Sequence, residues 1–463
     1  MIRDTVVQYV YIAAGLAFIA AIKWMTAPTT ARRGVLAGEI GMVLAVVGTL
    51  VRPEVTSYTW IVVGLMAGAA IGVPLAAFVP MTAMPQRTAL SHAFGAAAAT
   101  LVGVAEYILR QPHLDRFTMV VLGIEVLLGG LTVTGSLMAF AKLQELIQGR
   151  PVVHRGQNVI NLSVLAVAVA GIVWLAIDPS AVLIFAIVVI AAVIFGILLI
   201  VPIGGADMPT VIALLNSYAG LSAVAMGFAL DNKVLEIAGA LDGSSGFVLA
   251  VVMCRAMNRN FRSILFGAFG QVTVAAHGAE VDDRPVRSGG SVDGAAILDG
   301  ARLVVIVPGY GMAVAQAQHK VRELYDALRR GGTEVKFAIH PVAGRMPGHM
   351  NVLLAEANIP YEALYEMETI NPEFPQADVA LVIGANDITN PAARTDQGSP
   401  IYGMPILDVD QARAIMVIKR SMAPGFAGID NDLYYNEKTT MLFGDARTVA
   451  ADLVGELSRS AAA

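Results

Sequence analysis

Cysteine and charged residues are scarce in this sequence, and each shortage excludes a class of protein. Cys254 is the single cysteine, so a disulfide-stabilised scaffold is excluded. Charged residues make up 14% of the chain and hydrophobic residues 56%, whereas a soluble globular domain carries about 25% charged residues. The apolar content excludes an intrinsically disordered chain, and the net charge of -5 argues against a nucleic-acid-binding protein. We therefore expect a polytopic membrane protein with room for a soluble part.

Long apolar runs fill the first half of the chain. A helix needs about 20 mainly apolar residues to cross the hydrocarbon layer of a membrane. The runs predict about nine membrane spans, separated by short turns that carry proline, glycine or charged residues. The predicted spans are residues 5–24, 35–52, 59–79, 88–109, 118–141, 159–177, 181–201, 209–230 and 234–254.

Lysine and arginine are divided unevenly between the short loops. One set of alternate loops, which includes Arg87, Lys142 and Arg255, holds about twice as many of these residues as the other set. Loops rich in positive charge stay in the cytoplasm. With nine spans, we expect the N-terminus outside and the C-terminal domain in the cytoplasm. If residues 59–79 did not cross the membrane, the later orientations would be reversed.

Charged residues return at ordinary density after about residue 265. We divide the chain into a transmembrane domain (1–262), a polar, glycine-rich linker (263–290) and a soluble domain (291–463). In the soluble domain, strand-like runs alternate with helical patterns, which predicts a Rossmann-like α/β fold with a parallel sheet. The predicted strands are 303–307, 335–339, 379–383, 414–418 and 440–443, and the predicted helices are 312–330, 349–357 and a last one from 446.

A glycine-rich turn follows the first predicted strand. The strand runs into Gly309, Tyr310, Gly311, Met312, Ala313 and Val314, and a helix follows. This order suits a dinucleotide site, in which the glycines allow a tight turn and close backbone approach to a pyrophosphate. Val314 occupies the position of the usual third glycine or alanine. We favour a phosphate cradle over a purely structural turn.

The charges near the strand ends indicate which dinucleotide would bind. An NAD site usually places a carboxylate at the end of the second strand, but this strand ends with His340 and is followed by Arg345. Lys419, Arg420 and Ser421 close another apolar strand. Two cations beside a hydroxyl suit a 2′-phosphate, although they could also be a solvated strand end. The sequence favours NADP(H) over NAD(H).

Two further loops have the composition of binding loops. Gly384, Ala385, Asn386 and Asp387 follow a buried strand, at the edge where ligands lie in parallel sheets. Asp387 is a candidate partner of a carboxamide or a titrating group beside a nicotinamide, and a turn-forming aspartate is the equal alternative. The segment Gly425, Phe426 and Ala427 suits a lid over bound cofactor, or a plain surface loop.

Polar residues inside the predicted spans are candidates for a proton path, because they are costly in lipid. His92 lies in the fourth span among small residues, and histidine titrates near neutral pH. We favour a relay role over a structural hydrogen bond to a carbonyl. Asn216 could bridge water to His92 or bond between helices, and Asp207 could cap the eighth span or gate a proton exit. Glu106 and Glu125 are further carboxylates in the spans.

These segments together are specific to one family. The chain resembles the beta subunit of the proton-translocating NAD(P) transhydrogenases over essentially its full length. The matching segments are 204–209, 215–218, 239–241, 243–246, 253–259, 309–319, 344–356, 382–387, 419–422 and 441–445.

The resemblance implies roles for the candidate residues. It implies that Lys419, Arg420 and Ser421 bind the 2′-phosphate end of NADP(H), that Arg345 binds phosphates, and that His340 and Asp387 lie near the nicotinamide. It places Gly425, Phe426 and Ala427 in a lid, and His92 and Asn216 in the proton path. It also implies that the cofactor binds in a reversed orientation. Phe426 stands where the family leads us to expect tyrosine.

The sequence contains one dinucleotide fingerprint, whereas hydride transfer between two nicotinamides needs two sites. The resemblance assigns the NAD(H) site to an alpha subunit. It implies an Si-Re (AB-specific) enzyme that is active only with that partner, and we expect a dimer of alpha–beta units in the bacterial inner membrane. We expect no metal ion. The rival hypothesis is a channel or carrier regulated by a cytoplasmic NADP(H)-sensing domain.

Overall fold

The computed structural model describes residues 2–147, 152–258, 261, 284–399, 401–425 and 427–460. The chain divides into two compact units. The first contains Met1–Val79, Gln86–Ile203 and Val211–Ala250, and the second contains Pro80–Pro85, Gly204–Thr210 and Val251–Ala463. We describe each unit separately.

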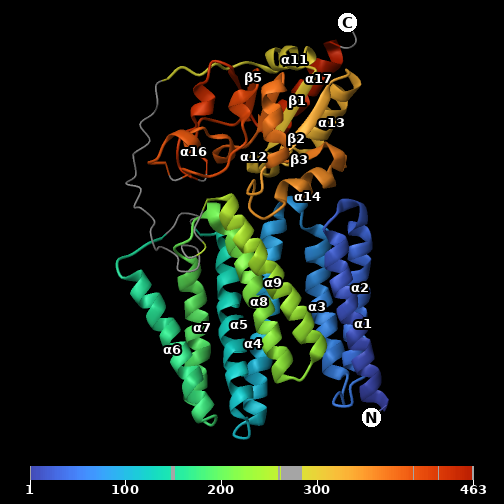
Figure 1. Cartoon of the computed structure of the whole chain (residues 1–463), viewed down its shortest axis with the longest axis vertical. Coiled ribbons are helices and arrows are strands. Elements are labelled where there is room, and N and C mark those ends of the chain that lie inside the picture. Colours follow the sequence, from blue (N-terminus) through green and yellow to red (C-terminus); the bar gives the residue numbers. More distant parts are fainter. Residues whose placement is uncertain are drawn as a thin grey trace. The chain divides into compact units, whose positions relative to one another are not determined.

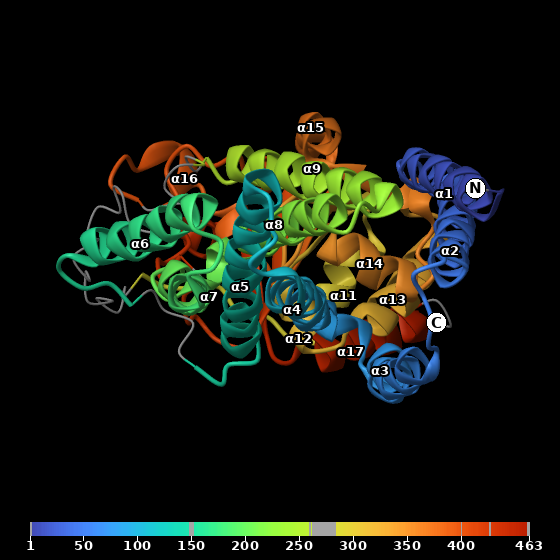
Figure 2. The same ribbon diagram turned by 90° about the horizontal axis from the view of Figure 1, so that it is seen from below.

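The first unit is a bundle of long helices. In the described part of the chain, nine helices are long and apolar enough to cross a membrane, which confirms the predicted spans. The helices are α1 Ile2–Met25, α2 Pro28–Leu50, α3 Thr59–Phe78, α4 Met84–Arg110, α5 Arg116–Leu143, α6 Gln157–Ile177, α7 Val182–Ile200, α8 Met208–Ala229 and α9 Lys233–Ala256. Helices α1 and α2 form a closely packed pair, and α5 packs against α6 and α7 (Figures 1 and 2).

A buried lysine joins two of these helices. Lys142, in the last turn of α5, is 5% exposed. Its Nζ donates hydrogen bonds to the carbonyl oxygens of Ile200, Val201 and Ile203, at 3.0, 2.8 and 2.7 Å. The last carbonyls of a helix have no partner within the helix and carry partial negative charge. The ammonium group therefore provides hydrogen bonds to the carbonyl oxygens at the C-terminal end of α7, which lipid could not do.

Glycines allow α8 and α9 to touch through their backbones (Figure 2). A Cβ atom on Gly220 would lie 2.2 Å from the backbone nitrogen of Gly243. One on Gly246 would lie 2.8 Å from the side-chain nitrogen of Asn216. Small residues at helix crossings are a general means of association in membranes, where no hydrophobic effect draws helices together.

The second unit contains a sheet of six parallel strands in the order β3-β2-β1-β4-β5-β6. This order is that of a doubly wound dinucleotide-binding fold and confirms the predicted fold class. Every residue of β4 is buried, as expected for a parallel sheet with both faces covered. The strands are β1 Leu303–Pro308, β2 Glu334–Ile339, β3 Leu364–Glu366, β4 Val379–Ile383, β5 Ala414–Lys419 and β6 Thr439–Phe443.

Helices α11 (Ser291–Asp299), α13 (Gln318–Arg330) and α17 (Ala446–Ser460) pack against one another beside the sheet (Figure 1). Helix α13 buries Val321, Leu324 and Leu328 and exposes ion pairs one turn apart on its other side. The crossovers from β4 to β5 and from β5 to β6 differ from the expected strand–helix alternation. Their described residues form only short helices such as α16 (Ala392–Thr395) and 3₁₀ turns, because prolines and glycines interrupt them.

Two predictions for this unit were wrong in detail. The helix expected over 312–330 is divided into α12 (Tyr310–Val314) and α13, because Gln316 takes a left-handed conformation (φ 48°) and Ala317 N bonds to Met312 O. Such a helix end usually has glycine or asparagine at the left-handed position, so the sequence carried no signal for it. The edge strand β3 was missed because three residues are too short to form a pattern.

The end of the predicted linker is paired with the sheet. Gly289 N donates to Met441 O at 3.0 Å, and Met441 N donates to Arg287 O at 2.8 Å. Residues 262–283 lie outside the described residues. The limits of the linker therefore stay a prediction.

We predict that Gly220→Ala destabilises the helical bundle by about 1–3 kcal/mol, because the added methyl group would overlap the α9 backbone. Gly64→Ala in α3 is the matched control, since no atom lies within 4 Å of its added methyl group in the described structure. Detergent-induced loss of the helical circular dichroism signal measures both variants. Equal stabilities would contradict the backbone contact.

Candidate functional site

The loops after β1 and β4 meet at the carboxyl edge of the sheet. The strand order is β3-β2-β1-β4-β5-β6. From β1 the chain therefore continues towards one edge of the sheet, to β2, and from β4 it continues towards the other edge, to β5. The crevice between such strands is the usual ligand site of a doubly wound fold. The structure therefore brings Gly309–Gly311 and Gly384–Asp387 together at one place, as predicted from the strand pattern.

Three glycines let these two loops cross in direct contact. Gly309 N donates to Ile383 O and Gly311 N donates to Gly384 O, both at 2.9 Å. A Cβ atom on Gly309 would lie 2.4 Å from Ala385 Cα, and one on Gly311 would lie 2.7 Å from Gly384 Cα. Gly384 itself has φ +62°, which favours glycine. The glycines of this fingerprint thus allow, first of all, two protein loops to approach each other closely.

The helix that follows the glycine turn is too short to act as a long helix dipole. Helix α12 has five residues, and Tyr310, Met312, Ala313 and Val314 lie within it. Met312 and Ala313 are buried in the core, whereas Val314 is 45% exposed. Backbone N–H groups and cationic side chains, rather than the macrodipole of a long helix, must therefore provide most of the attraction for a phosphate here.

A guanidinium group lies over the glycine turn. The Arg345 guanidinium stacks on the Tyr310 ring, 4.3 Å from its centroid, and Arg345 is 8% exposed. Its backbone N–H donates to Nδ1 of His349 at 3.1 Å. These contacts hold a positive charge beside the loop that the sequence assigned to phosphates.

Lys419, Arg420 and Ser421 end β5, next to the β4 loop. Lys419 Nζ donates to Ala423 O at 2.6 Å and lies 4.6 Å from the centroid of the Tyr434 ring. Burial lowers the pKa of Lys419, and the carboxylates of Asp430 and Asp387 act in the opposite direction. Arg420 and Ser421 are exposed. In the described part of the chain, the Arg420 side chain has no hydrogen bond or ion pair.

The lid segment lies against the β4 loop. Ala427 N donates to Oδ2 of Asp387 at 3.0 Å. A Cβ atom on Gly425 would lie 2.6 Å from Nδ2 of Asn386 and 2.7 Å from Oδ1 of Asp387. Phe426 lies outside the described residues. Asp387 thus fixes the position of the segment by accepting a hydrogen bond from its backbone, which is a structural role. The second carboxylate oxygen of Asp387 lies beside Gly425.

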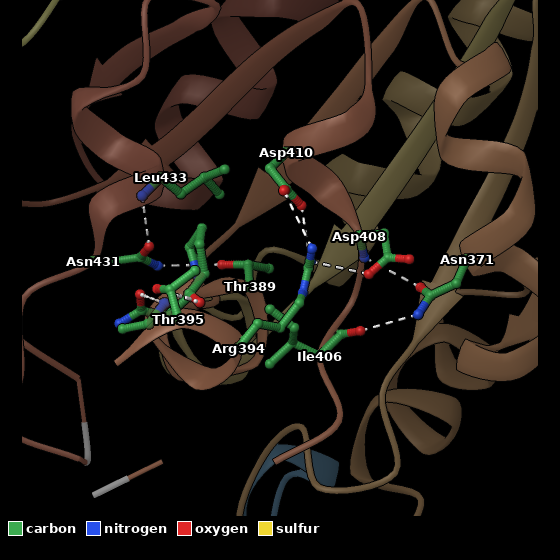
Figure 3. Close-up of polar contacts among 12 residues, drawn as sticks. Asn371, Thr389, Arg394, Thr395, Ile406, Asp408, Asp410, Asn431 and Leu433 are labelled. Carbon is green, nitrogen blue, oxygen red and sulfur yellow. Dashed lines mark hydrogen bonds and ion pairs between the residues drawn. The ribbon is translucent and has the colours of Figure 1, made fainter. Parts of the chain in front are cut away.

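A buried network orients Asn386. Tyr434 donates from its hydroxyl to Asn386 Oδ1 at 2.9 Å and to Ala385 O at 3.1 Å. Asn431 donates to Asn386 O and to Thr389 Oγ1, at 3.0 and 3.3 Å, and accepts from Leu433 N (Figure 3). Nδ2 of Asn386 is buried without a hydrogen-bond partner in the described structure. It is therefore an unpaired buried donor that lies beside Gly425.

His340 is a buried, neutral anchor. It is 1% exposed, accepts from Val342 N on Nδ1, and pairs through Nε2 with Pro405 O at 2.9 Å. Burial lowers the pKa of His340 to about 4, and the bond to Pro405 O partly opposes this shift. With Nδ1 accepting, Nε2 carries the proton and donates.

The segment after Pro405 is held from two further sides. Asn371 donates to Ile406 O at 3.0 Å, and Arg394 pairs with Asp408 at 3.0 Å and with Asp410 at 2.9 Å (Figure 3). These bonds tie the crossover between β4 and β5 to the carboxyl edge of the sheet. They fix the position of this segment beside a site that is otherwise made of loops.

The residues present fit a phosphorylated dinucleotide. The loops that cross at Gly384 leave no room for side chains, Arg345 and Arg420 carry positive charge, and Asn386 offers an unpaired donor. These are the groups that pyrophosphate, a ribose phosphate and an amide would require.

A second polar cluster lies inside the helical bundle. Nδ2 of Asn216 (α8) donates to Oδ1 of Asp242 (α9) at 3.1 Å. In the described part of the chain, no hydrogen bond joins Asn216 to His92 (α4), so the predicted link between the two side chains stays a prediction. Nδ1 of His92 is buried without a hydrogen-bond partner among the described residues.

His92 also lines a cavity of about 710 Å³ between α3 and α4. Arg87, Thr88 and Ser91 lie on the α4 side of the cavity, and Gly68 and Gly72 on the α3 side. The wall of this space is largely apolar, and its polar groups come from α4. Asp207, in contrast, lies on the 3₁₀ turn Gly205–Asp207 that precedes α8, where it is 9% exposed.

Comparison with known protein sequences identifies the family of this chain. The sequence profile of the NAD(P) transhydrogenase beta subunit matches residues 7–456. The NAD(P) transhydrogenase subunit beta of Rhodospirillum rubrum is 48% identical over 452 residues, which cover 96% of this chain and 97% of the relative. A second sequence of that name, from a defined strain of the same organism, matches equally.

The chain belongs to the NAD(P) transhydrogenase beta subunit family. The family resemblance inferred from the sequence motifs is thereby confirmed. As a transhydrogenase beta subunit, the chain functions in hydride transfer between NADH and NADP⁺ that is coupled to proton translocation. The name beta subunit also implies an alpha partner.

Three residues of this transhydrogenase subunit were missed by the sequence analysis. Tyr434 and Asn431 orient Asn386, and neither belongs to a motif, so only the fold could bring them to the site. Asp242 is bonded to Asn216 inside the bundle. It could have been found, because a carboxylate within an apolar span is itself a signal.

We predict that acid destabilises the C-terminal unit through His340. An ordinary histidine pKa is about 6.5 in the unfolded chain, and the folded pKa of His340 is about 4. The unfolded state therefore binds the proton between these values, and stability falls as the pH is lowered through that window. Burial also lowers the pKa of His349 to about 4, so both histidines contribute in the same direction.

Urea unfolding of residues 284–460 from pH 7 to pH 4 measures this slope. In His340→Gln, which keeps a donor for Pro405 O, we expect a slope smaller by about 1.4 kcal/mol per pH unit. An unchanged slope would contradict the buried, neutral state of His340.

Proposed function

We propose that this chain binds NADP(H) at the carboxyl edge of its sheet, while the alpha subunit binds NAD(H). The observation that carries the proposal is the pair of cations at the end of β5, where Arg420 is exposed and Lys419 is held in place by Ala423 O. A 2′-phosphate carries nearly two negative charges, and a guanidinium fork beside an ammonium complements it. Ser421 adds a hydroxyl at the same strand end.

The other site residues bind and orient the dinucleotide. Arg345 and the turn around Gly309 and Gly311 face the phosphates, and Asn386 and Asp387 face the nicotinamide end, with His340 fixing the loop behind them. The segment 425–427 folds over the cofactor as a lid. When both nicotinamides are bound, they supply the hydride chemistry, and the protein supplies orientation and exclusion of water. The cofactor orientation is reversed relative to the common fingerprint, as in the family.

The assembly needed for activity extends beyond this chain. The sequence contains one dinucleotide fingerprint, so turnover depends on the alpha subunit, and transfer has Si-Re (AB) specificity. We propose a dimer of alpha–beta units in the bacterial inner membrane, with the C-terminal domain in the cytoplasm. The excess of lysine and arginine in one set of loops supports this orientation.

We predict that Arg420→Ala weakens NADPH binding by about 10- to 100-fold, since a hydrogen bond to a charged group contributes about 1.5–3 kcal/mol. NADH lacks the 2′-phosphate, so its weaker binding should not change. Calorimetric titration of the C-terminal unit with both cofactors measures the difference.

Arg413→Ala is the matched control. Arg413 precedes the same strand β5, at the opposite edge of the sheet, and pairs with Asp378 at 2.8 Å. Its loss should leave both affinities unchanged. If Arg420→Ala lowered the two affinities equally, the assignment of the 2′-phosphate to the end of β5 would be wrong.

We further propose that His92 and Asn216 carry the proton, and that Asp207 gates its passage near the start of α8. His92 lines a cavity of about 710 Å³, and Asn216 is bonded to a carboxylate within the bundle, that of Asp242. Inward movement of one charge through 100 mV supplies about 2.3 kcal/mol. At about 1.4 kcal/mol per factor of ten, this favours NADPH formation more than tenfold. Protonation of His92 and affinity for NADP(H) must then influence each other reciprocally.

We predict that His92→Gln abolishes proton pumping, because glutamine cannot titrate, while NADPH binding by the C-terminal unit stays intact. Dye quenching in vesicles that contain both subunits measures pumping. Pumping at the normal rate would remove His92 from the relay.

The family membership favours an enzyme over the rival channel or carrier with a nucleotide sensor. Membranes with both subunits should reduce an acetylpyridine analogue of NAD⁺ with NADPH. The absence of this reaction in membranes that bind NADPH would favour the sensor.

A further inference from the structure

Glu125 places a carboxyl group deep inside the helical bundle. Helix α5 runs from Arg116 to Leu143, and Glu125 lies more than two turns from either end. The residue is 0% exposed in the described structure. A carboxylate within a membrane-spanning helix is costly, and it persists where it is paired or adjoins water. The surroundings of Glu125 therefore indicate which form of the carboxyl group is tolerated.

The carboxyl group of Glu125 has no fixed hydrogen-bond donor. Neither of its oxygens has a hydrogen-bond partner among the described residues. The nearest hydroxyl group is used by the backbone instead, because Oγ of Ser222 (α8) donates to the backbone oxygen of Glu125 at 2.9 Å. A buried, unpaired carboxylate would lose its hydration without compensation, and such a group takes up a proton. The described structure therefore favours the neutral acid.

Glycines bring this acid against α4 and next to two hydroxyl groups. A Cβ atom on Gly103 of α4 would lie 3.1 Å from the carboxyl carbon of Glu125 and 3.1 Å from its Oε1. One turn along α5, a Cβ atom on Gly129 would touch Oγ1 of Thr100 and lie 3.0 Å from Oγ of Ser222. One acid and two hydroxyl groups thus lie where α4, α5 and α8 meet (Figure 2).

The acid packs on the face of α4 that carries His92. Gly103, which contacts Glu125, lies about three turns beyond His92, or 16 Å along the axis. Residues that are a whole number of turns apart share one face of a helix. Glu106 lies about one turn farther on and pairs with Arg110 at 2.7 Å. Glu125 therefore lies between the level of His92 and that of a charged pair near the end of α4.

The helices around α5 supply no counter-charge that would keep Glu125 ionised. Helices α6 and α7, which pack against α5, contain no ionisable residue. On α8 the ionisable side chain is Tyr218. On α4 the nearest cation, Arg110, is already paired with Glu106. On α5 itself, Arg116 and Lys142 lie more than two turns away.

We propose that Glu125 is a second proton-binding residue of the bundle, which holds its proton as a carboxylic acid at neutral pH and releases it in each pumping cycle. The step passes one proton from the carboxyl oxygen to an adjoining hydroxyl group or water and returns one from the other side, without a change of redox state. A purely structural acid would donate its proton to a fixed acceptor, and Glu125 has none among the described residues. The inference rests on the proposed relay through His92 and extends it along α4.

Infrared spectroscopy of vesicles that contain the alpha and beta subunits tests the protonation state. The spectrum of the wild type minus that of Glu125→Gln should contain, at pH 7, the carbonyl stretching band of a protonated carboxyl group. The band should shift when D₂O replaces H₂O, because an acid that releases its proton also exchanges it. Carboxylate bands in its place, or a band that D₂O does not shift, would overturn the proposal.

Dye quenching in the same vesicles tests the role in turnover. In Glu125→Gln, which keeps the shape of the side chain, we expect pumping to fall by about 100-fold, as on loss of a positioned proton-transfer group. Glu125→Asp should retain part of the rate, because it keeps an acid. Normal pumping in Glu125→Gln would make the acid structural. Equal losses in both variants would report packing, and either result overturns the proposal.

Glu236→Gln is the matched control, because it removes a carboxylate from the first turn of α9, where Glu236 pairs with Lys233 at 2.8 Å. It should leave pumping unchanged. Binding of NADPH by the vesicles checks the assembly of every variant. If Glu125→Gln does not assemble, Glu125→Asp decides: a displaced carboxyl band with a partial pumping rate supports the proposal, and any other result overturns it.

His92→Gln separates this inference from the relay on which it rests. Normal pumping in His92→Gln would remove His92 from the relay, whereas the proton on Glu125 is detected by its own infrared band. Loss of pumping in His92→Gln but not in Glu125→Gln would leave the relay in place and remove only Glu125.

Discussion

Lipid cannot hydrogen-bond to protein, and this constraint governs the membrane half of the molecule. A polar group in the bundle is costly unless it finds a partner on its own helix or on another. Lys142 satisfies the last carbonyls of α7, and Asn216 of α8 bonds to Asp242 of α9. Glycines such as Gly220 and Gly246 bring the backbones close enough for these contacts. The same rule that builds the bundle therefore confines its ionisable groups to a few places, and those places are the candidates for proton transfer.

The soluble half obeys a different constraint, set by the geometry of a parallel sheet. Strands β1 and β4 leave the sheet centre in opposite directions, so their loops must cross at one edge. The crossing is so tight that Gly309, Gly311 and Gly384 are needed for protein contacts alone. The absence of side chains there also exposes backbone that a phosphate can approach. The structural role of these glycines and the binding role proposed for them thus have a common origin.

Prediction succeeded where the local pattern was long and failed where it was short. Nine apolar runs and five strand-like runs are long enough to be recognised from length and composition, and the described structure contains the corresponding elements. The break at Gln316 and the strand β3 depend on single residues whose conformation is decided by their neighbours in space. Candidates such as His92, Arg345 and Lys419 were predicted from the local sequence, and their roles stay predictions. Tyr434 and Asn431 lie far from Asn386 in sequence, and no local pattern could connect them.

The order of residues alone determined that this chain has a half made of long apolar helices and a half with a Rossmann-like fold, because hydropathy and glycine spacing are local properties. It also determined the charges available to a phosphate. Only the tertiary structure decided which of these groups meet. Asp242 reaches Asn216 because α8 and α9 cross at glycines, and His340 is neutral because the loop at Pro405 covers it. Such contacts arise from packing between distant segments, and packing is not encoded at any single position.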